Sequence, residues 1–222
     1  MKVMVVAAHP DDEVLGCGAT MARHSATSDV VDVLILGTGA LSRDHPAGGD
    51  VATLEQQAHQ AGRILGAREV RVLNFPDNRF DSVDLLDIVK RVEAEIARAA
   101  PEVIYTHHVG DLNIDHRRTV EAVVTACRPM TRDGVRRILS FEVPSSTEWQ
   151  APAAYPAFAP NVFVDVTDSL ERKLEAIKVY SGEIRSFPHP RSVEALTALA
   201  RWRGASAGFL AAEAFVLIRE RA

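Results

Sequence analysis

The chain alternates short apolar runs, rich in valine, isoleucine and leucine, with longer segments of helical periodicity. The apolar runs occupy residues 3–8, 30–36, 70–73, 103–105 and 138–143. Helical patterns separate them, at residues 13–24, 54–65, 83–99 and 119–127. Short continuous apolar runs predict strands that are buried on both faces. Because strands that alternate with helices predict crossover connections, we expect an α/β fold with a mostly parallel central sheet and helices on both faces.

The segment that follows residue 143 departs from this pattern. Residues 144–160 are rich in proline and predict an irregular excursion. Beyond them we expect an edge strand at 162–166, helices at 169–180 and 192–203, and a last strand at 214–218. The sequence shows no repeat, low-complexity tract or clear linker. We therefore expect one domain over residues 1–222, whose C-terminal part, residues 144–222, completes the binding pocket.

Composition excludes several classes of protein. A length of 222 residues suits one α/β domain, and a net charge of −5 argues against duplex nucleic acid and anionic membranes as partners. The two cysteines, Cys17 and Cys127, form no C-x-x-C pair, so we expect buried reduced thiols and a reducing compartment. The first apolar run is too short for a signal peptide, and no segment approaches the roughly 20 apolar residues of a membrane span. We expect a cytoplasmic protein.

Polar residues of unusual chemistry follow the predicted strands. In an open parallel sheet, ligands bind beyond the carboxyl ends of the strands. That rule selects residues 9–12, 74–81, 106–116 and 144–149. Since these stretches also hold most of the chain's unusual polar residues, the strand pattern and the composition indicate the same site.

The first polar cluster is His-Pro-Asp-Asp-Glu at residues 9–13, directly after the first predicted strand. His9 and Asp12 are three residues apart and can converge on one cation, and imidazole with carboxylate suits zinc. Asp11 would then be available to act on a water molecule. Alternatively, the acids could simply cap the following helix, where its dipole favours negative charge. From spacing alone both interpretations stay open, although a cap does not explain the histidine.

The second cluster places three histidines and two aspartates within residues 106–116. One histidine would be unremarkable in an exposed polar loop. Three of the chain's eight histidines within this stretch are less easily explained in that way. We expect His116 to open the next helix and face the first cluster, and Asp115 to orient a ligand or a catalytic histidine. His107 and His108 stay ambiguous, and at least one should be a packed, hydrogen-bonded core histidine.

The Ala-His-Pro-Asp-Asp-Glu stretch at residues 8–13, with the later Asp115–His116 pair, resembles the LmbE-like or PIG-L superfamily of N-deacetylases. The resemblance covers most of the chain by the order of motifs and is strongest at residues 3–20 and 103–119. It implies a Rossmann-like three-layer fold. It also implies metal-dependent hydrolysis of the N-acetyl group of a small amino-sugar-containing substrate, and assembly into trimers or hexamers.

The resemblance also implies roles for individual residues. His9, Asp12 and His116 would hold Zn²⁺, with a zinc-bound water as nucleophile and Asp11 as general base. The sequence does not decide between Zn²⁺ and another divalent ion such as Fe²⁺. The family's second motif is His-x-Asp-His, and here Asn113 stands in place of its first histidine. That departure puts a separate histidine acid in doubt, but Asn113 can still donate a hydrogen bond to an oxyanion.

Further contacts to the N-acetylated substrate are expected from polar and aromatic residues that follow strands. These candidates are Asp77, Asn78, Arg79, His108, Asp111 and Trp149. Two alternatives stay open, since Pro-Asp-Asn is good turn chemistry and Trp149 could pack under the proline-rich loop. We interpret three later residues as part of a solvated loop, namely Arg185, His189 and Arg191.

Two other classes of function compete with the deacetylase. The first is a non-catalytic, metal-containing sugar- or metabolite-binding module, which the replacement at Asn113 favours. Retention of Asp11 argues against it, because binding alone needs no general base. The second is a metal-free nucleotide-binding protein. The glycines of a phosphate cradle are missing, since Gly16 and Gly18 fall inside a predicted helix and Met21 stands where a third glycine is needed.

Overall fold

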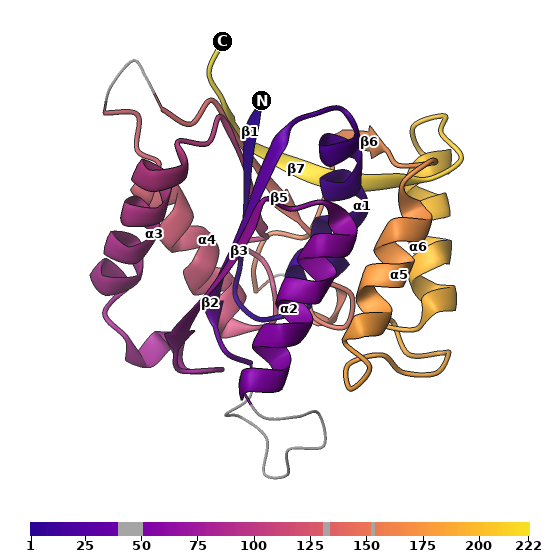
Figure 1. Cartoon of the computed structure of the whole chain (residues 1–222), viewed down its shortest axis with the longest axis horizontal. Helices are drawn as coiled ribbons and strands as arrows, with labels where there is room; N and C mark the ends of the chain where they lie inside the picture. Colours follow the sequence, from indigo (N-terminus) through magenta and orange to yellow (C-terminus); the bar gives the residue numbers. More distant parts are fainter. Residues whose placement is uncertain (40–50, 131–133, 152–153) are drawn as a thin grey trace.

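A computed structural model describes residues 1–39, 51–130, 134–151 and 154–222. Within these residues the chain forms a seven-stranded sheet of order β3-β2-β1-β4-β5-β7-β6 (Figure 1). The parallel strands are β1 (Lys2–Ala7), β2 (Val30–Gly37), β3 (Glu69–Phe75), β4 (Val103–His107) and β5 (Arg137–Phe141). The last two, β6 (Val162–Asp165) and β7 (Ala212–Glu220), join in antiparallel fashion, with β6 at the edge. The predicted, mostly parallel sheet is confirmed.

Helices cover both faces of the sheet (Figure 1). One layer contains α1 (Asp12–Ala26), α2 (Val51–Leu65), α5 (Leu170–Val179) and α6 (Val193–Ala205). The opposite layer contains α3 (Leu85–Ala99) and α4 (Ile114–Ala126). The three-layer architecture expected from the sequence is therefore confirmed. None of the helices in the described part of the chain has the length and apolar character that a membrane span requires.

Strand β1 shows why the first apolar run is continuous. Val3, Val5 and Ala7 pack into the cluster under α1 and α5, whereas Met4 and Val6 pack into the cluster under α3 and α4. Side chains alternate between the faces of a strand, and both faces of this strand are buried. The end of β1 is thus held rigidly at the centre of the sheet.

Helix α1 packs very closely on the sheet. A Cβ atom added to Gly16 would lie 2.3 Å from the ring of Phe141 in β5, so only glycine fits there. This close approach accounts for the glycine at position 16 without any phosphate cradle. It brings the first turn of α1 against the carboxyl ends of the central strands.

The helix is interrupted at Cys17, where φ is −150°, and a buried ion pair supports the break. Glu213 of β7 accepts hydrogen bonds from the backbone nitrogens of Ala19 at 3.1 Å and Thr20 at 2.7 Å. Lys173 of α5 donates to Glu213 at 2.6 Å and to the carbonyl of Leu15 at 2.7 Å. The pair therefore replaces backbone hydrogen bonds that the break removes.

The largest difference between a predicted and an observed helix boundary lies at the start of α4. The helix expected at 119–127 begins at Ile114, because Asn113 caps it by accepting a hydrogen bond from the backbone nitrogen of Asp115 at 2.8 Å. His116 consequently lies in the first turn of α4, as expected.

Lys173→Met should destabilise the protein by about 3–5 kcal/mol, because it leaves Glu213 buried without its cation. Urea unfolding at neutral pH measures the change. Lys178→Met, on the exposed side of the same helix, is the matched control and should change stability by less than about 0.5 kcal/mol. Equal stability of the two variants would show that the buried pair does not support α1.

Candidate functional site

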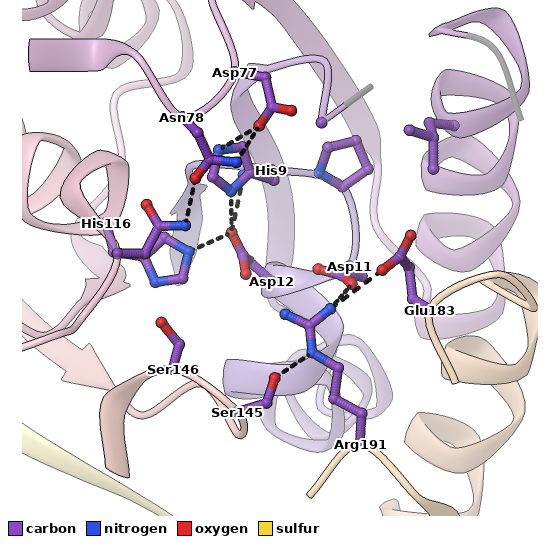
Figure 2. A pocket seen from close by; sticks show the side chains of 14 residues that line it. His9, Asp11, Asp12, Asp77, Asn78, His116, Ser145, Ser146, Glu183 and Arg191 are labelled. Atoms are coloured by element: carbon purple, nitrogen blue, oxygen red, sulfur yellow. Dashed lines mark hydrogen bonds and ion pairs between the residues drawn. The ribbon is translucent and has the colours of Figure 1, made fainter. Parts of the chain in front are cut away.

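A cavity of about 180 Å³ opens at the carboxyl edge of the sheet (Figure 2). It is lined by residues that follow five strands, namely His9 to Asp12 after β1, Gly39 after β2, Asp77 and Asn78 after β3, Asn113 and His116 after β4, and Ser145 and Ser146 after β5. Glu183 and Arg191, from the segment between α5 and α6, complete one wall. The structure therefore brings the stretches selected by the strand-edge rule to one place.

His9, Asp12 and His116 converge within this cavity, and all three are largely buried. The Oδ2 atom of Asp12 lies 3.4 Å from His9 Nδ1 and 3.2 Å from His116 Nε2. Two atoms that bind one tetrahedral ion at roughly 2.0–2.1 Å lie about 3.3 Å apart. The three side chains therefore fit a divalent cation both by their spacing and by their chemistry.

A carboxylate lies behind each of the two histidines. Asp115 Oδ2 is 2.8 Å from His9 Nε2. Asp111 Oδ1 is 3.0 Å from His116 Nδ1, close enough for an ion pair but not aligned for a hydrogen bond. Each imidazole thus turns one nitrogen to Asp12 and the other to a supporting carboxylate, the arrangement that fixes the tautomer of a metal-binding histidine.

A second group, His9, Asp77 and Asp115, also has its oxygen and nitrogen atoms close together. Asp115, however, accepts hydrogen bonds from the backbone nitrogens of Asn78 at 2.6 Å and Phe80 at 2.9 Å. With His9 as a third partner, both of its oxygens are occupied. Asp115 is therefore better suited to orient His9 than to bind a second ion.

The electrostatics of the three converging side chains suit a cation. Burial favours a neutral imidazole, yet the bonds to Asp115 and Asp12 raise the pKa of His9 to about 10. Against the same effect of burial, Asp12 and Asp111 raise the pKa of His116 to about 9. Although burial acts to raise the pKa of Asp12, His116 and His9 hold it well below its usual range. The site therefore favours positive charge. A bound divalent ion would supply that charge in place of protons on the two imidazoles.

Asp11 is held by contacts to both its backbone and its side chain. It is the N-cap residue of α1, but its carboxylate pairs with Arg191 at 2.7 Å instead of the helix N–H groups, so the simple capping interpretation does not hold for it. Its backbone nitrogen donates to Glu13 at 3.0 Å, and Glu13 accepts from the hydroxyl of Tyr180 at 2.6 Å. Burial, opposed by Arg191 and reinforced by Asp12, raises the pKa of Asp11 to about 7.

Three non-glycine residues that line the cavity have left-handed backbone conformations. Their φ angles are 100° for Asp11, 51° for Asn78 and 70° for Ser145. Such conformations cost free energy and persist where the surroundings enforce them, typically at functional sites. This backbone strain therefore supports the cavity as the functional site.

Of the two ambiguous histidines, His107 is the packed core residue. Its Nε2 accepts from the backbone nitrogen of Ala8 at 2.9 Å, and its ring stacks on His116 at 3.9 Å. Burial holds the pKa of His107 well below its usual value. His108, a predicted substrate contact, is also buried and lies 3.0 Å from the carbonyl of Pro156.

The predicted substrate contacts are not all at the cavity. Asp77 and Asn78 line it, whereas four other described candidates lie outside its lining, namely Arg79, His108, Asp111 and Trp149. Asp111 is buried behind His116, where it also accepts hydrogen bonds from Ser146 and Thr147. Trp149 is 53% exposed and meets His189 edge-on. The position of Asp111 suits a supporting role for His116, and Trp149 lies outside the cavity lining. Contact with a substrate stays a prediction for all six candidates.

The sequence pattern did not indicate the contribution of the C-terminal segment. Arg191 was assigned to a solvated loop, and this was wrong, because its side chain is 19% exposed and pairs with Asp11. Glu183 and Tyr180 were not singled out for the site either. Because Arg191 lies 180 positions after Asp11, no local spacing could have linked them.

Comparison with known proteins decides the family. The model of the PIG-L family, described as GlcNAc-PI de-N-acetylase, matches residues 4–127. The chain belongs to the PIG-L family. It is 29% identical over 186 residues to the uncharacterized deacetylase YaiS of Escherichia coli strain K12, covering 81% of this chain and 90% of that protein. It is 26% identical over 198 residues to a diacetylchitobiose deacetylase of Thermococcus kodakarensis, covering 82% and 70% respectively.

The fold of the family is also found in an enzyme with a different reaction. The crystal structure of GalB, the 4-carboxy-2-hydroxymuconate hydratase of Pseudomonas putida KT2440, superposes with a TM-score of 0.81 at 22% identity, covering 100% of this chain and 97% of that one. At this identity the likeness concerns the fold alone. The reaction must therefore be inferred from the site.

Asp115→Asn should weaken the affinity for Zn²⁺ about 10–100-fold, because the carboxylate that orients His9 is lost while the three converging side chains remain. Competition with a chelating indicator measures the affinity. Asp81→Asn removes an exposed carboxylate from the segment after β3 that packs against Asp115, and it should leave zinc binding unchanged. If the two variants bound zinc equally, Asp115 would have no supporting role.

Proposed function

We propose that this protein is a metal-dependent N-deacetylase that hydrolyses the N-acetyl group of a small substrate containing an amino sugar. The observation that carries the proposal is the donor set of His9, Asp12 and His116 beside an oriented, buried carboxylate, Asp11. Membership of the PIG-L family and the names of the two related deacetylases support the reaction and the class of substrate.

The metal in this proposal is held by His9, Asp12 and His116. Two imidazoles and one carboxylate suit Zn²⁺, and another divalent ion such as Fe²⁺ would use the same ligands. A divalent ion supplies Lewis acidity, which polarises a carbonyl group and makes water a better nucleophile near neutral pH. Asp115 and Asp111 keep the two imidazoles oriented toward Asp12.

Asp11 is the proposed general base. Its Oδ2 atom is engaged by Arg191, and its other oxygen points away from Arg191 toward Asp12 (Figure 2). That oxygen accepts a proton from water as the water oxygen attacks the acetamide carbonyl carbon. The proton then passes to the amide nitrogen as the carbon–nitrogen bond breaks. The products are acetate and a free amine.

Asn113 takes the place of the histidine in the family's second motif. Its side-chain oxygen caps α4, and its amide nitrogen donates to Asn78 at 3.0 Å. An amide nitrogen carries two hydrogens, so the second one is assigned to the substrate's carbonyl oxygen as negative charge develops there. Because Asn113 cannot release a proton, the proposal gives Asp11 both proton transfers.

A non-catalytic, metal-containing sugar- or metabolite-binding module is the second candidate function, and the replacement at Asn113 favours it. The contacts around Asp11 argue against it. Arg191, Glu13 and Tyr180 together support one carboxylate in a left-handed backbone conformation. Binding alone does not require a base to be oriented in this way.

Zinc-loaded protein should release acetate from at least one member of a panel of N-acetylated amino sugars. Asp11→Asn should lower this rate about 10²–10⁴-fold with zinc content unchanged, because it removes only the proton acceptor. His9→Ala should lose both zinc and activity. Acetate assays and metal analysis of the same samples measure these outcomes.

Two results would contradict the proposal. Full activity in Asp11→Asn would remove Asp11 from the mechanism. Folded, zinc-loaded wild type that released no acetate from the whole panel would favour the binding module.

A further inference from the structure

The segment between α5 and α6 is far from Asp11 in the sequence but lies beside this proposed base in the structure. Tyr180, Glu183 and Arg191 all lie in or beside it, beyond residues 4–127 that the family model matches. Tyr180 is fully buried, and Glu183 and Arg191 line the cavity. This wall of the site therefore derives from a part of the chain outside the residues that the family model matches.

The side chain of Arg191 contacts Asp11, Ser145 and Glu183 there, and Figure 2 shows its guanidinium between Asp11 and Ser145. Its Nη1 donates to Asp11 Oδ2 at 2.7 Å, and its Nε donates to Ser145 Oγ at 2.7 Å. The same Nη1 lies 3.4 Å from Glu183 Oε2. A planar guanidinium with donors in fixed directions can satisfy these partners together, whereas the single ammonium group of lysine cannot reproduce the arrangement.

The contacts of Arg191 restrict the carboxylate of Asp11. The contacts to the backbone of Asp11 do not fix the orientation of that group. The Glu13–Tyr180 pair holds the backbone nitrogen of Asp11, but the carboxylate turns about χ2, a torsion with a broad energy profile. The bond from Arg191 to Oδ2 fixes that torsion. It leaves the remaining oxygen directed toward Asp12 (Figure 2).

We propose that Arg191 is a positioning residue for the reaction, which acts by fixing the Asp11 carboxylate while Ser145 and Glu183 fix the guanidinium. The inference rests on the proposed function, in which Asp11 moves the proton. A base that is misplaced by about 1 Å can cost about 100-fold in rate. Arg191 therefore affects turnover without binding the metal or the substrate.

The first test separates positioning from a structural role. Arg191→Ala should lower kcat about 100-fold with KM, zinc content and melting temperature little changed. Arg191→Lys should recover only a small part of the loss. Added guanidinium chloride at low concentration should restore part of the activity of Arg191→Ala and none of that of Asp11→Asn.

Two further variants sharpen this comparison. Arg185→Ala is the matched control, because Arg185 lies in the same segment and donates to the carbonyls of Gly182 and Ile184 instead of to the cavity. It should behave as wild type. Ser145→Gly keeps the left-handed backbone and removes the hydroxyl, so it should lower kcat in the same manner but less than Arg191→Ala.

A binding measurement tests the inference without turnover. Acetohydroxamate chelates zinc and can donate a hydrogen bond to the base, so calorimetry with zinc-loaded protein should show about tenfold weaker binding to Arg191→Ala, equivalent to one lost hydrogen bond. Arg185→Ala should bind it as wild type does.

The outcomes separate this inference from the proposed function. If wild type turns over substrate and Arg191→Ala keeps its kcat, the positioning role is overturned and the deacetylase stands. If wild type turns over nothing, the hydroxamate measurement alone decides, and equal affinity in wild type and Arg191→Ala overturns the role. A raised KM with a lowered melting temperature and no rescue by guanidinium would show that Arg191 only ties down the loop.

Discussion

The buried carboxylate of Asp12 is the group on which the site depends. It is 1% exposed, and its Oδ2 atom accepts from the backbone nitrogen of His9 at 2.9 Å while two imidazole nitrogens lie within 3.4 Å. A carboxylate buried without compensation costs several kcal/mol, so the surroundings must supply positive charge. The first turn of α1 supplies part of it through the helix dipole, and the imidazoles supply more. A metal ion bound at this position would supply further positive charge to Asp12. The helix start and the metal site are therefore compatible uses of one motif.

Residues from different parts of the chain support Asp12, some by orienting the two histidines and others by stabilising α1. Asp115 and Asp111 orient the two histidines from the β4–α4 connection. Gly16 allows α1 to lie against β5, and the Lys173–Glu213 pair stabilises the break one residue later. The fold thus places the polar groups whose burial costs the most free energy where the sheet ends. Helix starts and strand ends there offer backbone N–H groups that hydrogen bond with them.

The sequence predicted those parts of the structure that local patterns determine. Buried strands appear as apolar runs, and His9, Asp12 and His116 stand directly after such runs or at the following helix start. Contacts between distant segments could not be derived in this way. Arg191 reaches Asp11 only because of the path of the loop after α5, and Asp111 turns inward to His116 although its loop is polar. Composition indicates which residues lie at the sheet edge, but the direction of a loop side chain depends on the whole packed structure.

In the proposed function, one divalent ion binds between His9, Asp12 and His116. Anomalous diffraction at the zinc edge from zinc-loaded crystals tests it most directly. We expect a single peak at about 2.0–2.2 Å from His9 Nδ1, Asp12 Oδ2 and His116 Nε2. A peak between His9, Asp77 and Asp115, or no bound zinc in folded protein, would contradict it.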